Sequence, residues 1–350
     1  MKKRNLIALV MLVLAALIIL PLVAGCGSTT TTTITEAVTT TVAPETTTTA
    51  AAETTTTAPA ETTTTAAAAA YDINAVLAAI KPDTTIVVPD KYKTASVKVG
   101  SDVPYPPWEM FVGETTQITG YDYDLAQAIG AKLGVKVDFV TMKFDSLLIG
   151  LGAGNIDVIM SSMYDDLTRQ KQADFVDYAK DGTALLVAKG NPEKIAGWLD
   201  LSGKAVGAEK GTTQAAALAA LNVYLKGQGK PEVTINEFPD QPAAILAIKS
   251  GNVVADLTDA STGAFVAQTT DNGTSLELVV DPNPPAGLGF ELKIDGIAVG
   301  KSNSGLRDAI QKALQSLMDD GTYKTIIDHY GLQPYPQADV NASKDPGSGA

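Results

Sequence analysis

The sequence predicts an α/β protein made of two compact lobes. Strand-like apolar runs alternate with helix-like segments from about residue 95 to residue 332, a pattern typical of parallel sheets flanked by helices. Roughly 265 residues of globular composition begin at residue 71, a length that suits two lobes better than one. Because ligands of such folds bind beyond the carboxyl ends of the strands, we expect a site there.

The first half of this region predicts two strand–helix repeats. The first helix is expected to be capped by Asp122, to carry an apolar residue every four positions, and to end at Gly134. In order, the segments are a strand at 95–100, the helix from 122 to 134, a strand at 135–140, a helix at 144–151, a buried strand at 156–160 and a strand at 185–188.

A second series of strands and helices starts near residue 204. It consists of a strand at 204–208, helices at 213–225 and 242–250, and a strand at 253–257. The chain then returns to a strand at 296–299. The last helix is expected to be capped by Ser304 and to end at Gly321, with one apolar face formed by Leu306, Ile310, Leu314 and Leu317.

Residues 1–25 have the features of an export signal. Three basic residues at positions 2–4 precede an apolar run from Leu6 to Leu20, and small residues stand directly before Cys26. This arrangement resembles the lipobox of bacterial lipoproteins, although Val23 replaces the more usual leucine. Cleavage would leave Cys26 as a lipid-modified N-terminus, with palmitate among its acyl chains, and each buried methylene of the lipid contributes about 0.8 kcal/mol. An uncleaved membrane anchor is the alternative, because the apolar run is long.

Composition restricts the chemistry that the chain can perform. Cys26 is the only cysteine, so its lipidation would leave no thiol for a disulfide, a metal site or a nucleophile. His329 is the only histidine and lies in a short amphipathic segment near the C-terminus, where a structural role is expected. The formal net charge of −13 argues against nucleic-acid binding, since phosphates would stay unneutralised. We therefore expect no metal, no cofactor and no catalytic residue.

Residues 26–70 are expected to form a disordered linker. They are mostly Thr and Ala, with Glu45, Glu53 and Glu61 at even spacing, and hold few large apolar groups to offset the entropy cost of ordering. A flexible coil of this length would reach on the order of 35 Å. Its threonines are candidates for glycosylation. Residues 71–94 are interpreted as an N-terminal extension of the globular part, and residues 336–350 as a disordered tail.

Several segments, taken in order, resemble one known family. The resemblance is carried by Val99–Glu109, Thr119–Ala126, Gly154–Met163, Arg169, Ala173–Phe175, Gly211–Gln214, Asp259 and Asp320–Tyr323. Their order and spacing are similar to those of the type II periplasmic binding proteins, in the amino-acid-binding branch called solute-binding protein family 3.

The resemblance implies two Rossmann-like α/β lobes joined by a two-strand hinge. Lobe 1 would comprise 95–186 and 293–335, and lobe 2 would comprise 190–288. It also implies a monomeric, lipid-anchored, extracytoplasmic receptor that captures an L-amino acid and delivers it to the permease of an ABC importer. Because the ligand would contact both lobes, its binding would stabilise the closed form.

The resemblance further assigns residues that hold the two charges of an amino acid. Arg169 matches the carboxylate clamp, and its planar guanidinium suits bidentate pairing. Thr213, at the start of a predicted helix, matches a backbone N–H donor to the same carboxylate. Asp259 matches the aspartate that pairs with the ammonium group. The alternatives are a surface arginine, an ordinary N-cap threonine and an aspartate that caps a helix.

The segment that begins at Ser162 departs in part from the family pattern. Ser162 matches a second acceptor for the ammonium group, and Met163 follows it. Many members of the family have Ser or Thr where this chain has Tyr164. The ring of Tyr164 would shrink the cleft or stack on the ligand, so the geometry of the head group is less determined here than at Arg169.

Four residues match positions that line the side-chain pocket, namely Asp102, Tyr105, Trp108 and Phe144. Aromatic walls suit the aliphatic stem of a ligand, while Asp102 would accept hydrogen bonds from an amide or a cation. This combination favours a polar or basic side chain over an acidic one and leaves the amino acid unnamed. Packing of Trp108 in the core of lobe 1 is the alternative.

Two other functions use the same scaffold. One is an enzyme similar to cyclohexadienyl dehydratase, which would need an acid–base pair in the cleft. The other is the input module of a sensor, which would need a partner receptor, because no apolar span follows the domain in this sequence. The combination of Arg169 with Asp259, and the absence of a histidine in the predicted cleft, favour the binding protein over the enzyme.

Overall fold

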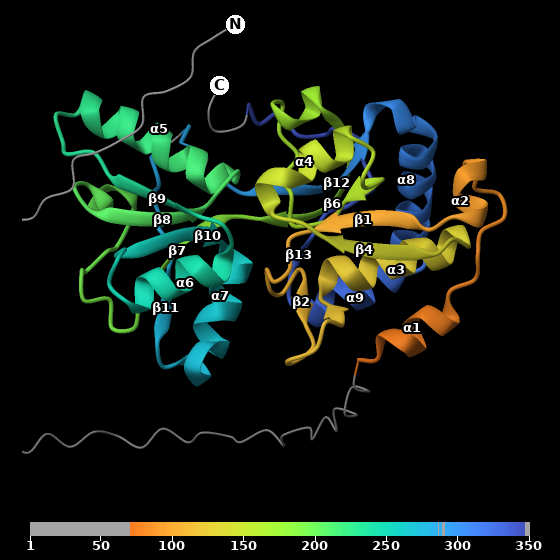
Figure 1. Ribbon diagram of the computed structural model, residues 1–350, viewed down its shortest axis with the longest axis horizontal. Helices are drawn as coiled ribbons and strands as arrows, with labels where there is room; N and C mark the ends of the chain where they lie inside the picture. The colour runs from red at the N-terminus through yellow and green to blue at the C-terminus, as the bar shows by residue number, and fades with distance from the viewer. Residues whose placement is uncertain (1–70, 286, 289–290, 347–350) are drawn as a thin grey trace, which may run out of the picture. The chain divides into compact units, whose positions relative to one another are not determined.

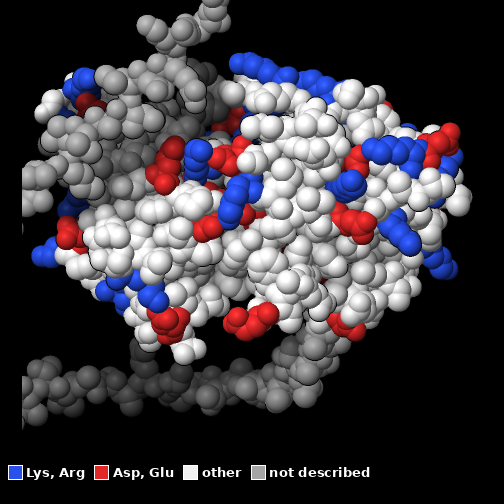
Figure 2. All heavy atoms as spheres, in the orientation of Figure 1, with Lys and Arg blue, Asp and Glu red and all other residues white. Residues whose placement is uncertain are grey.

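The computed structural model describes residues 71–285, 287–288 and 291–346. This part of the chain forms two α/β lobes, each built around its own sheet (Figure 1). In the described ranges, no helix has both the length and the apolar character needed to span a bilayer. The predicted signal at 1–25, the predicted lipid-attachment residue Cys26 and the predicted linker at 26–70 lie outside the described residues. On the face seen in Figure 2, basic and acidic side chains are interspersed and do not gather by sign.

Lobe 1 contains the larger sheet. Its strands are β1 (Val97–Ser101), β4 (Val137–Thr141), β5 (Val158–Ile159), β6 (Ala173–Asp181), β12 (Lys293–Gly300) and β13 (Gln333–Pro334). Its helices are α3 (Tyr121–Leu133), α4 (Phe144–Gly152), α8 (Ser304–Asp319) and α9 (Thr322–Tyr330). The strand order is β13-β6-β12-β5-β1-β4. β1 pairs in parallel with β4 and β5, whereas β12 runs antiparallel to β5 and β6.

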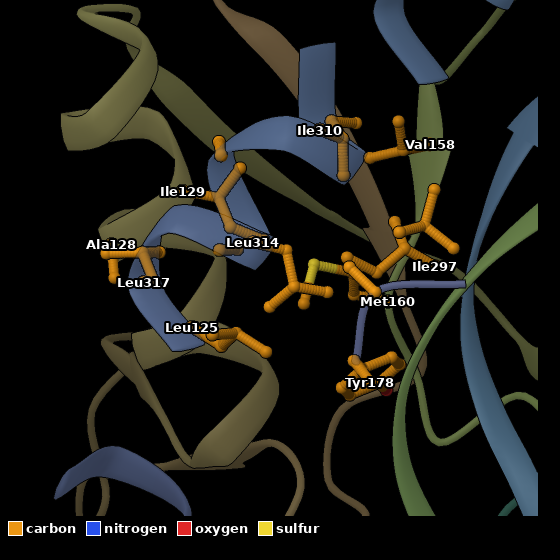
Figure 3. Packing of buried hydrophobic residues seen from close by; sticks show 14 of the residues in the cluster. Leu125, Ala128, Ile129, Val158, Met160, Tyr178, Ile297, Ile310, Leu314 and Leu317 are labelled. Carbon is orange, nitrogen blue, oxygen red and sulfur yellow. The ribbon is translucent and has the colours of Figure 1, made fainter. Parts of the chain in front are cut away.

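Successive side chains of the central strands in lobe 1 point to opposite faces of the sheet, so the lobe has one apolar core on each face. Val158, Val176 and Ile297 pack with α3, α8 and α9, while their strand neighbours Phe175 and Ala298 pack with α4. Figure 3 shows the first of these two layers, with Leu314 of α8 between the sheet and α3. Burying a leucine or isoleucine in such a layer contributes about 1.5–3 kcal/mol to the stability of the folded state. The apolar faces predicted from the sequence therefore hold the sheet between its helices.

Lobe 2 is smaller and follows the second predicted series. Its strands are β7 (Thr183–Ala188), β8 (Ala205–Glu209), β9 (Thr234–Phe238), β10 (Ala255–Asp259) and β11 (Leu276–Val279). Its helices are α5 (Thr213–Gly227), α6 (Gln241–Lys249) and α7 (Ala260–Thr269). The strand order is β11-β7-β10-β8-β9, with β8 parallel to β9 and β10. The shorter elements of the described chain are α1 (Ile73–Ala79), α2 (Asp90–Thr94), the hairpin of β2 (Met110–Phe111) and β3 (Ile118–Thr119), and the 3₁₀ turns at Arg169–Lys171, Trp198–Leu201, Thr270–Gly273 and Lys301–Asn303.

The two lobes are connected where β6 and β12 leave lobe 1. These strands pair with each other as far as Asp181 and Lys293, and β7 begins two residues after Asp181. This agrees with a connection by two paired strands. The pairing of β7 with β10 and β11 places 183–188 in lobe 2, whereas the sequence assigned residues up to 186 to lobe 1. The difference arises because an isolated strand of apolar residues does not reveal which sheet it joins.

The start of α3 differs from the prediction in a way that affects the site. Gly120, rather than Asp122, precedes the helix, with φ 124°, and a Cβ there would lie 2.4 Å from the carbonyl oxygen of Trp108. Asp122 is fully buried, and its carboxylate accepts hydrogen bonds from the backbone N–H of Ser162 at 2.9 Å and from the hydroxyl of Tyr178 at 2.7 Å. A residue that the sequence assigns to capping therefore holds the loop that carries Ser162. Similarly, Ser304 is the first residue of α8 and Asn303 is its N-cap.

The N-terminal extension packs on lobe 1. Tyr92 of α2 is buried in the core of that lobe. The ring of Tyr71 stacks on the imidazole of His329, with centroids 3.8 Å apart, and its hydroxyl donates to Asp124 at 2.7 Å. These contacts agree with the structural role that the sequence indicates for His329.

Residues 336–346, here called the C-terminal strap, lie against lobe 1, where the sequence predicts a disordered tail. Asn341 exchanges hydrogen bonds with the backbone of Phe175 in β6. The carbonyl of Asp345 accepts from the N–H of Leu167 at 2.8 Å, and its carboxylate lies 3.0 Å from the buried ammonium of Lys293. The strap is ordered by these polar contacts with partners far away in sequence, which its own composition does not indicate. Residues 347–350 lie outside the described residues.

Candidate ligand-binding cleft

A cavity lies between the two lobes, at the carboxyl ends of β1, β5, β8 and β10, as expected for sheets of this type. The space between its lining atoms, part of which is open to solvent, amounts to about 310 Å³. Both lobes contribute to its lining, which consists of Asp102, Tyr105, Phe144, Ser161, Ser162, Tyr164, Arg169, Glu209, Thr212, Thr213, Gln214 and Asp259.

Most of the residues that the sequence proposes as ligand contacts meet in this cavity, but two do not. Trp108 is fully buried in the core of lobe 1, where its ring makes edge contacts with Tyr121 and Tyr178. Its indole Nε1–H donates to Ser261 of lobe 2 at 2.9 Å. Met163 points to the other side of its segment and packs under α4 with Leu147. Ser162 and Tyr164 line the cavity, whereas Met163 between them does not.

Arg169 is held at the cavity mainly by lobe 1, and its Nη2 also lies 3.5 Å from the carbonyl oxygen of Gly211 in lobe 2. It opens a 3₁₀ turn after a segment in which Asp166 accepts from the backbone N–H groups of Thr168 and Arg169, both at 2.8 Å. Its Nη1 donates to the carbonyl of Tyr164 at 3.0 Å, and its guanidinium carbon lies 5.5 Å from the centre of the Phe144 ring. Burial lowers the pKa of Arg169, while the charge of Asp166 opposes that shift. The guanidinium is thus a fixed, desolvated cation that faces the cavity.

The start of α5 adds a second group for an anion. Thr212 is the N-cap of this helix, and its hydroxyl accepts from the N–H of Ala215 at 3.2 Å. Thr213, the first helical residue, lines the cavity together with Gln214. A helix N-terminus carries partial positive charge and backbone donors directed outward. Together with Arg169 from the other lobe, it forms a positive end of the cavity.

Asp259 forms the negative end. It is the last residue of β10 and is 2% exposed. Its Oδ2 accepts from Tyr105 and from Ser162, each at 3.0 Å, and its Oδ1 accepts from Tyr164 and Gln214. Burial raises the pKa of Asp259, and the hydrogen bonds from Tyr164, Ser162 and Tyr105 oppose that rise. The carboxylate is satisfied by neutral donors, while a cationic donor would stabilise it more strongly.

Two further acidic residues line the cavity. Asp102, which follows β1, and Glu209, which ends β8, are each 4% exposed and both line the cavity. Lys143 lies 3.8 Å from Asp102 but only 2.7 Å from Asp240, so its charge is shared. Tyr105 and Phe144 line the same cavity. This part of the cavity lining therefore combines aromatic walls with an excess of negative charge.

Four lining residues were not identified from the sequence, namely Ser161, Glu209, Thr212 and Gln214. Ser161 and Gln214 act through their hydrogen bonds to Glu109 and Asp259. For Glu209 a signal exists, because it directly follows the predicted strand at 204–208. The carboxyl end of a parallel strand is where a polar residue is exposed to a ligand.

Ion pairs connect the lobes at the rim of the cavity. Asp145, in the first turn of α4, lies 2.9 Å from the ammonium of Lys210 in lobe 2. The pair between Lys143 and Asp240 likewise joins α4 to the N-cap of α6. Hydrogen bonding to Lys210 lowers the pKa of Asp145. Because these side chains are partly exposed, each pair stabilises the closed form only modestly.

Removal of the Asp145–Lys210 pair is expected to weaken ligand binding by about two- to threefold, because only the closed form contains it. Asp145→Asn, Lys210→Met and the double variant form a cycle in which the second change adds little to the first. The dissociation constant, measured by titration calorimetry at low and high salt, reports the effect, which salt should reduce. The Lys324–Asp328 pair within α9 provides a control that does not span the lobes. Single changes whose effects multiply in the double variant would contradict the prediction.

Comparison with known proteins identifies the family. A model described as "Bacterial extracellular solute-binding proteins, family 3" matches residues 97–333. The chain is 30% identical over 235 residues to ABC transporter arginine-binding protein 1 of Escherichia coli (strain K12), an alignment that covers 67% of this chain and 90% of that protein. It is 27% identical over 233 residues to the L-cystine-binding protein TcyJ of the same strain, with 66% and 81% covered.

The solved structures agree with this result. An ancestral arginine-binding protein bound to arginine has a TM-score of 0.59 and 36% sequence identity, covering 67% of this chain and 98% of its own. The fold that the resemblance implied, two α/β lobes of the type II periplasmic binding proteins, is thereby confirmed. Since the family match spans well over half of its length, the chain belongs to the bacterial extracellular solute-binding proteins of family 3.

Proposed function

We propose that this protein captures a free L-amino acid between its lobes and delivers it to the permease of an ABC importer. The observation that carries the proposal is the pairing of opposite charges in one cavity. Arg169 of lobe 1 and Asp259 of lobe 2 both line it, and both are nearly fully buried. A zwitterion is the ligand class that satisfies both charges at once.

The burial of these groups explains why the ligand needs both of its charges. A carboxylate that enters the closed cavity loses its water, and this loss is offset only if cationic and N–H donors replace the water. Arg169 and the start of α5 supply such donors. An ammonium group gains the same compensation from Asp259 and the oxygen of Ser162. A keto acid would leave Asp259 without a cationic partner, so we propose that an amino acid is preferred.

For the ligand's side chain we propose a cation, as in arginine, lysine or ornithine. Asp102 and Glu209 add two carboxyl groups to the lining of the cavity, and the nearby Lys143 is also paired with Asp240. An acidic ligand would meet like charge there, which is costly in a desolvated site. The similarity to proteins named for arginine binding supports this choice.

The remaining features of the proposal concern place and assembly. We propose that the protein acts outside the cytoplasm as a monomer, anchored through a lipid on Cys26, and that residues 26–70 separate the lobes from the membrane. We also propose that it binds its ligand without chemical change, since the related proteins named above are binding proteins. Neither a nucleic acid nor a metal or other cofactor is part of this function.

A thermal-shift panel tests the proposal. Each of the twenty amino acids, together with ornithine, citrulline and the matching keto acids, is added to the purified protein at rising concentration. We expect the cationic amino acids to raise the melting temperature most, by an amount that grows with concentration, and the keto acids to have little effect. Stabilisation by keto acids equal to that by amino acids, or stabilisation by none of the amino acids, would overturn the proposal.

A further inference from the structure

We infer that the C-terminal strap positions the ligand clamp: its residues 343–346 hold the loop 165–170 so that Arg169 faces the cavity before the ligand enters. This inference rests on the proposed function, in which Arg169 binds the ligand carboxylate. It adds to that function a segment beyond the family match at 97–333. The strap should then contribute to the affinity for a carboxylate group, and not only to the stability of lobe 1.

The loop 165–170 presents different residues to the cavity and to the strap. Arg169 lines the cavity, and Oδ2 of Asp166 lies beside it, 3.5 Å from its Nε. The other four residues of the loop each form a hydrogen bond with the strap, both before and after Arg169 in the sequence. Loop and strap both belong to lobe 1, so these contacts do not depend on closure of the lobes.

Ser343 of the strap bridges the two ends of the loop. Its N–H donates to Oδ2 of Asp165 at 3.1 Å, and its carbonyl oxygen accepts from the side-chain amide of Gln170 at 3.1 Å. The same amide donates to Oδ1 of Asp165 at 2.8 Å, which closes a ring of three residues. Asp165 is fully buried and Ser343 is 6% exposed, so water competes little with these hydrogen bonds.

The next part of the strap holds the middle of the loop through its backbone. The carbonyl of Asp345 accepts from the N–H of Leu167 at 2.8 Å, and the carbonyl of Pro346 accepts from the hydroxyl of Thr168 at 3.0 Å. Thr168 directly precedes Arg169. These hydrogen bonds therefore fix the backbone from which the guanidinium projects.

The hydrogen bonds within the loop shape it without attaching it to the sheet. Asp166 accepts from the N–H groups of Thr168 and Arg169, and the 3₁₀ turn that begins at Arg169 has only three residues. So short a turn has little stability of its own. The loop is attached to the sheet through the N–H of Asp165, which donates to Ile294 of β12 at 2.8 Å, and through the strap.

The strap is itself anchored on the sheet of lobe 1, so it can hold the loop in place. Asn341 exchanges hydrogen bonds with the backbone of Phe175 in β6. The carboxylate of Asp345 lies 3.0 Å from the ammonium of Lys293 in β12, and Lys293 is 4% exposed. The strap thus connects two strands of the sheet to the segment that carries the clamp.

A fixed position matters for Arg169 because a guanidinium pairs with a carboxylate through two parallel hydrogen bonds. A loose clamp would have to be ordered when the ligand binds, and the entropy cost of this ordering reduces the affinity. Loss of the strap should therefore weaken the binding of an amino acid. It should have little effect on a ligand whose carboxylate is replaced by a neutral amide.

The test compares the full chain with a variant that ends at Ala342. This variant keeps Asn341 and its hydrogen bonds to β6 but lacks the residues that hold the loop. The probes are L-arginine and L-argininamide, or the amino acid that the thermal panel selects and its α-amide. Titration calorimetry should show that the shortened chain binds arginine about tenfold more weakly and argininamide within about twofold of the full chain.

Two further measurements show whether the effect passes through the clamp. In the Arg169→Met background, the same shortening should cost little additional affinity, because no guanidinium is left to position. Hydrogen exchange on the ligand-free protein provides a readout that needs no ligand. The N–H of Leu167, which donates to the strap, should exchange faster in the shortened chain.

Thr168→Val gives the same comparison if the shortened chain does not fold. The variant removes only the hydroxyl that donates to Pro346, so arginine should bind about threefold more weakly, with argininamide unchanged. Thr325→Val is the matched control, because its hydroxyl donates in the same way to the carbonyl of Gly321, at 3.1 Å, at the start of α9. It should bind both probes like the parent protein.

The outcomes separate this inference from the proposed function. Equal losses for arginine and argininamide would show that the strap only stabilises the fold. An unchanged dissociation constant for arginine would show that the loop holds Arg169 without the strap. Either result overturns the inference and leaves the receptor intact, whereas a full chain that binds no amino acid overturns both. A loss that is confined to arginine and absent in the Arg169→Met background supports the inference.

Discussion

Arg169→Met is expected to weaken amino-acid binding by about 100- to 1000-fold, or about 3–4 kcal/mol. The methionine has similar length and fills the space beside the Phe144 ring, where the guanidinium carbon now lies 5.5 Å from the ring centre. The ligand carboxylate would then enter a desolvated site with no cation opposite it, and only the start of α5 would remain as a donor. Titration calorimetry with the amino acid selected by the thermal panel measures the loss.

Two further arginine variants make this result specific. Arg169→Lys keeps the charge but loses the planar pair of donors, so an intermediate loss of about tenfold is expected. Arg307→Met removes an arginine of α8 that lies 2.7 Å from Asp174, away from the cleft, and should leave binding unchanged. An Arg169→Met protein with the dissociation constant of the parent would show that the carboxylate is held elsewhere.

Asp259→Asn is expected to produce the second large loss, about 100-fold for amino acids, with little change for the corresponding keto acids. The substitution removes the charge opposite the ammonium group. It also places an amide N–H₂ among side chains that now donate to the carboxylate, including Tyr105 and Ser162, both at 3.0 Å. Competition calorimetry with an amino acid and its keto acid measures the ratio of their affinities, which should approach one.

The control for Asp259→Asn is Asp308→Asn, which removes an exposed carboxylate of α8 that pairs with Arg307. It should change neither affinity nor the preference for an amine. If Asp259→Asn discriminates between amino acid and keto acid as strongly as the parent, the ammonium group is bound by a different residue. Melting curves of both variants distinguish loss of binding from loss of folding, because Asp259 is buried.

The sequence predicts the order of the main strands and helices because their apolar residues recur with the period of the element. It does not reveal β6 as a strand, although β6 is among the longest strands of the described chain and pairs with β12 over its full length. The reason is that β6 carries Asp174, Asp177 and Asp181 in buried positions. Such residues are stabilised by partners that are distant in sequence, for example Lys301 and Arg307 around Asp174. No local pattern contains that information.

The same distinction applies to the cleft. Arg169, Thr213 and Asp259 were identified because each stands in a recognisable segment, and all three line the cavity. Glu209, which also lines the cavity, was not identified, since only the packing of the two lobes brings it there. Trp108 was assigned to the pocket from its position in the resemblance, but its size and the neighbouring tyrosines place it in the core. Packing between helices and strands decides which face of a segment is turned to the cavity.

The C-terminal strap has a practical consequence for work on this protein. The family match stops at residue 333, but the described part of the chain extends to Pro346. The carbonyl of Pro346 accepts a hydrogen bond from the hydroxyl of Thr168 at 3.0 Å. Thr168 is the direct neighbour of Arg169. An affinity tag or fluorescent reporter fused close behind Pro346 would start next to the proposed carboxylate clamp, whereas an expression boundary drawn at residue 333 would discard Asp345, the partner of Lys293.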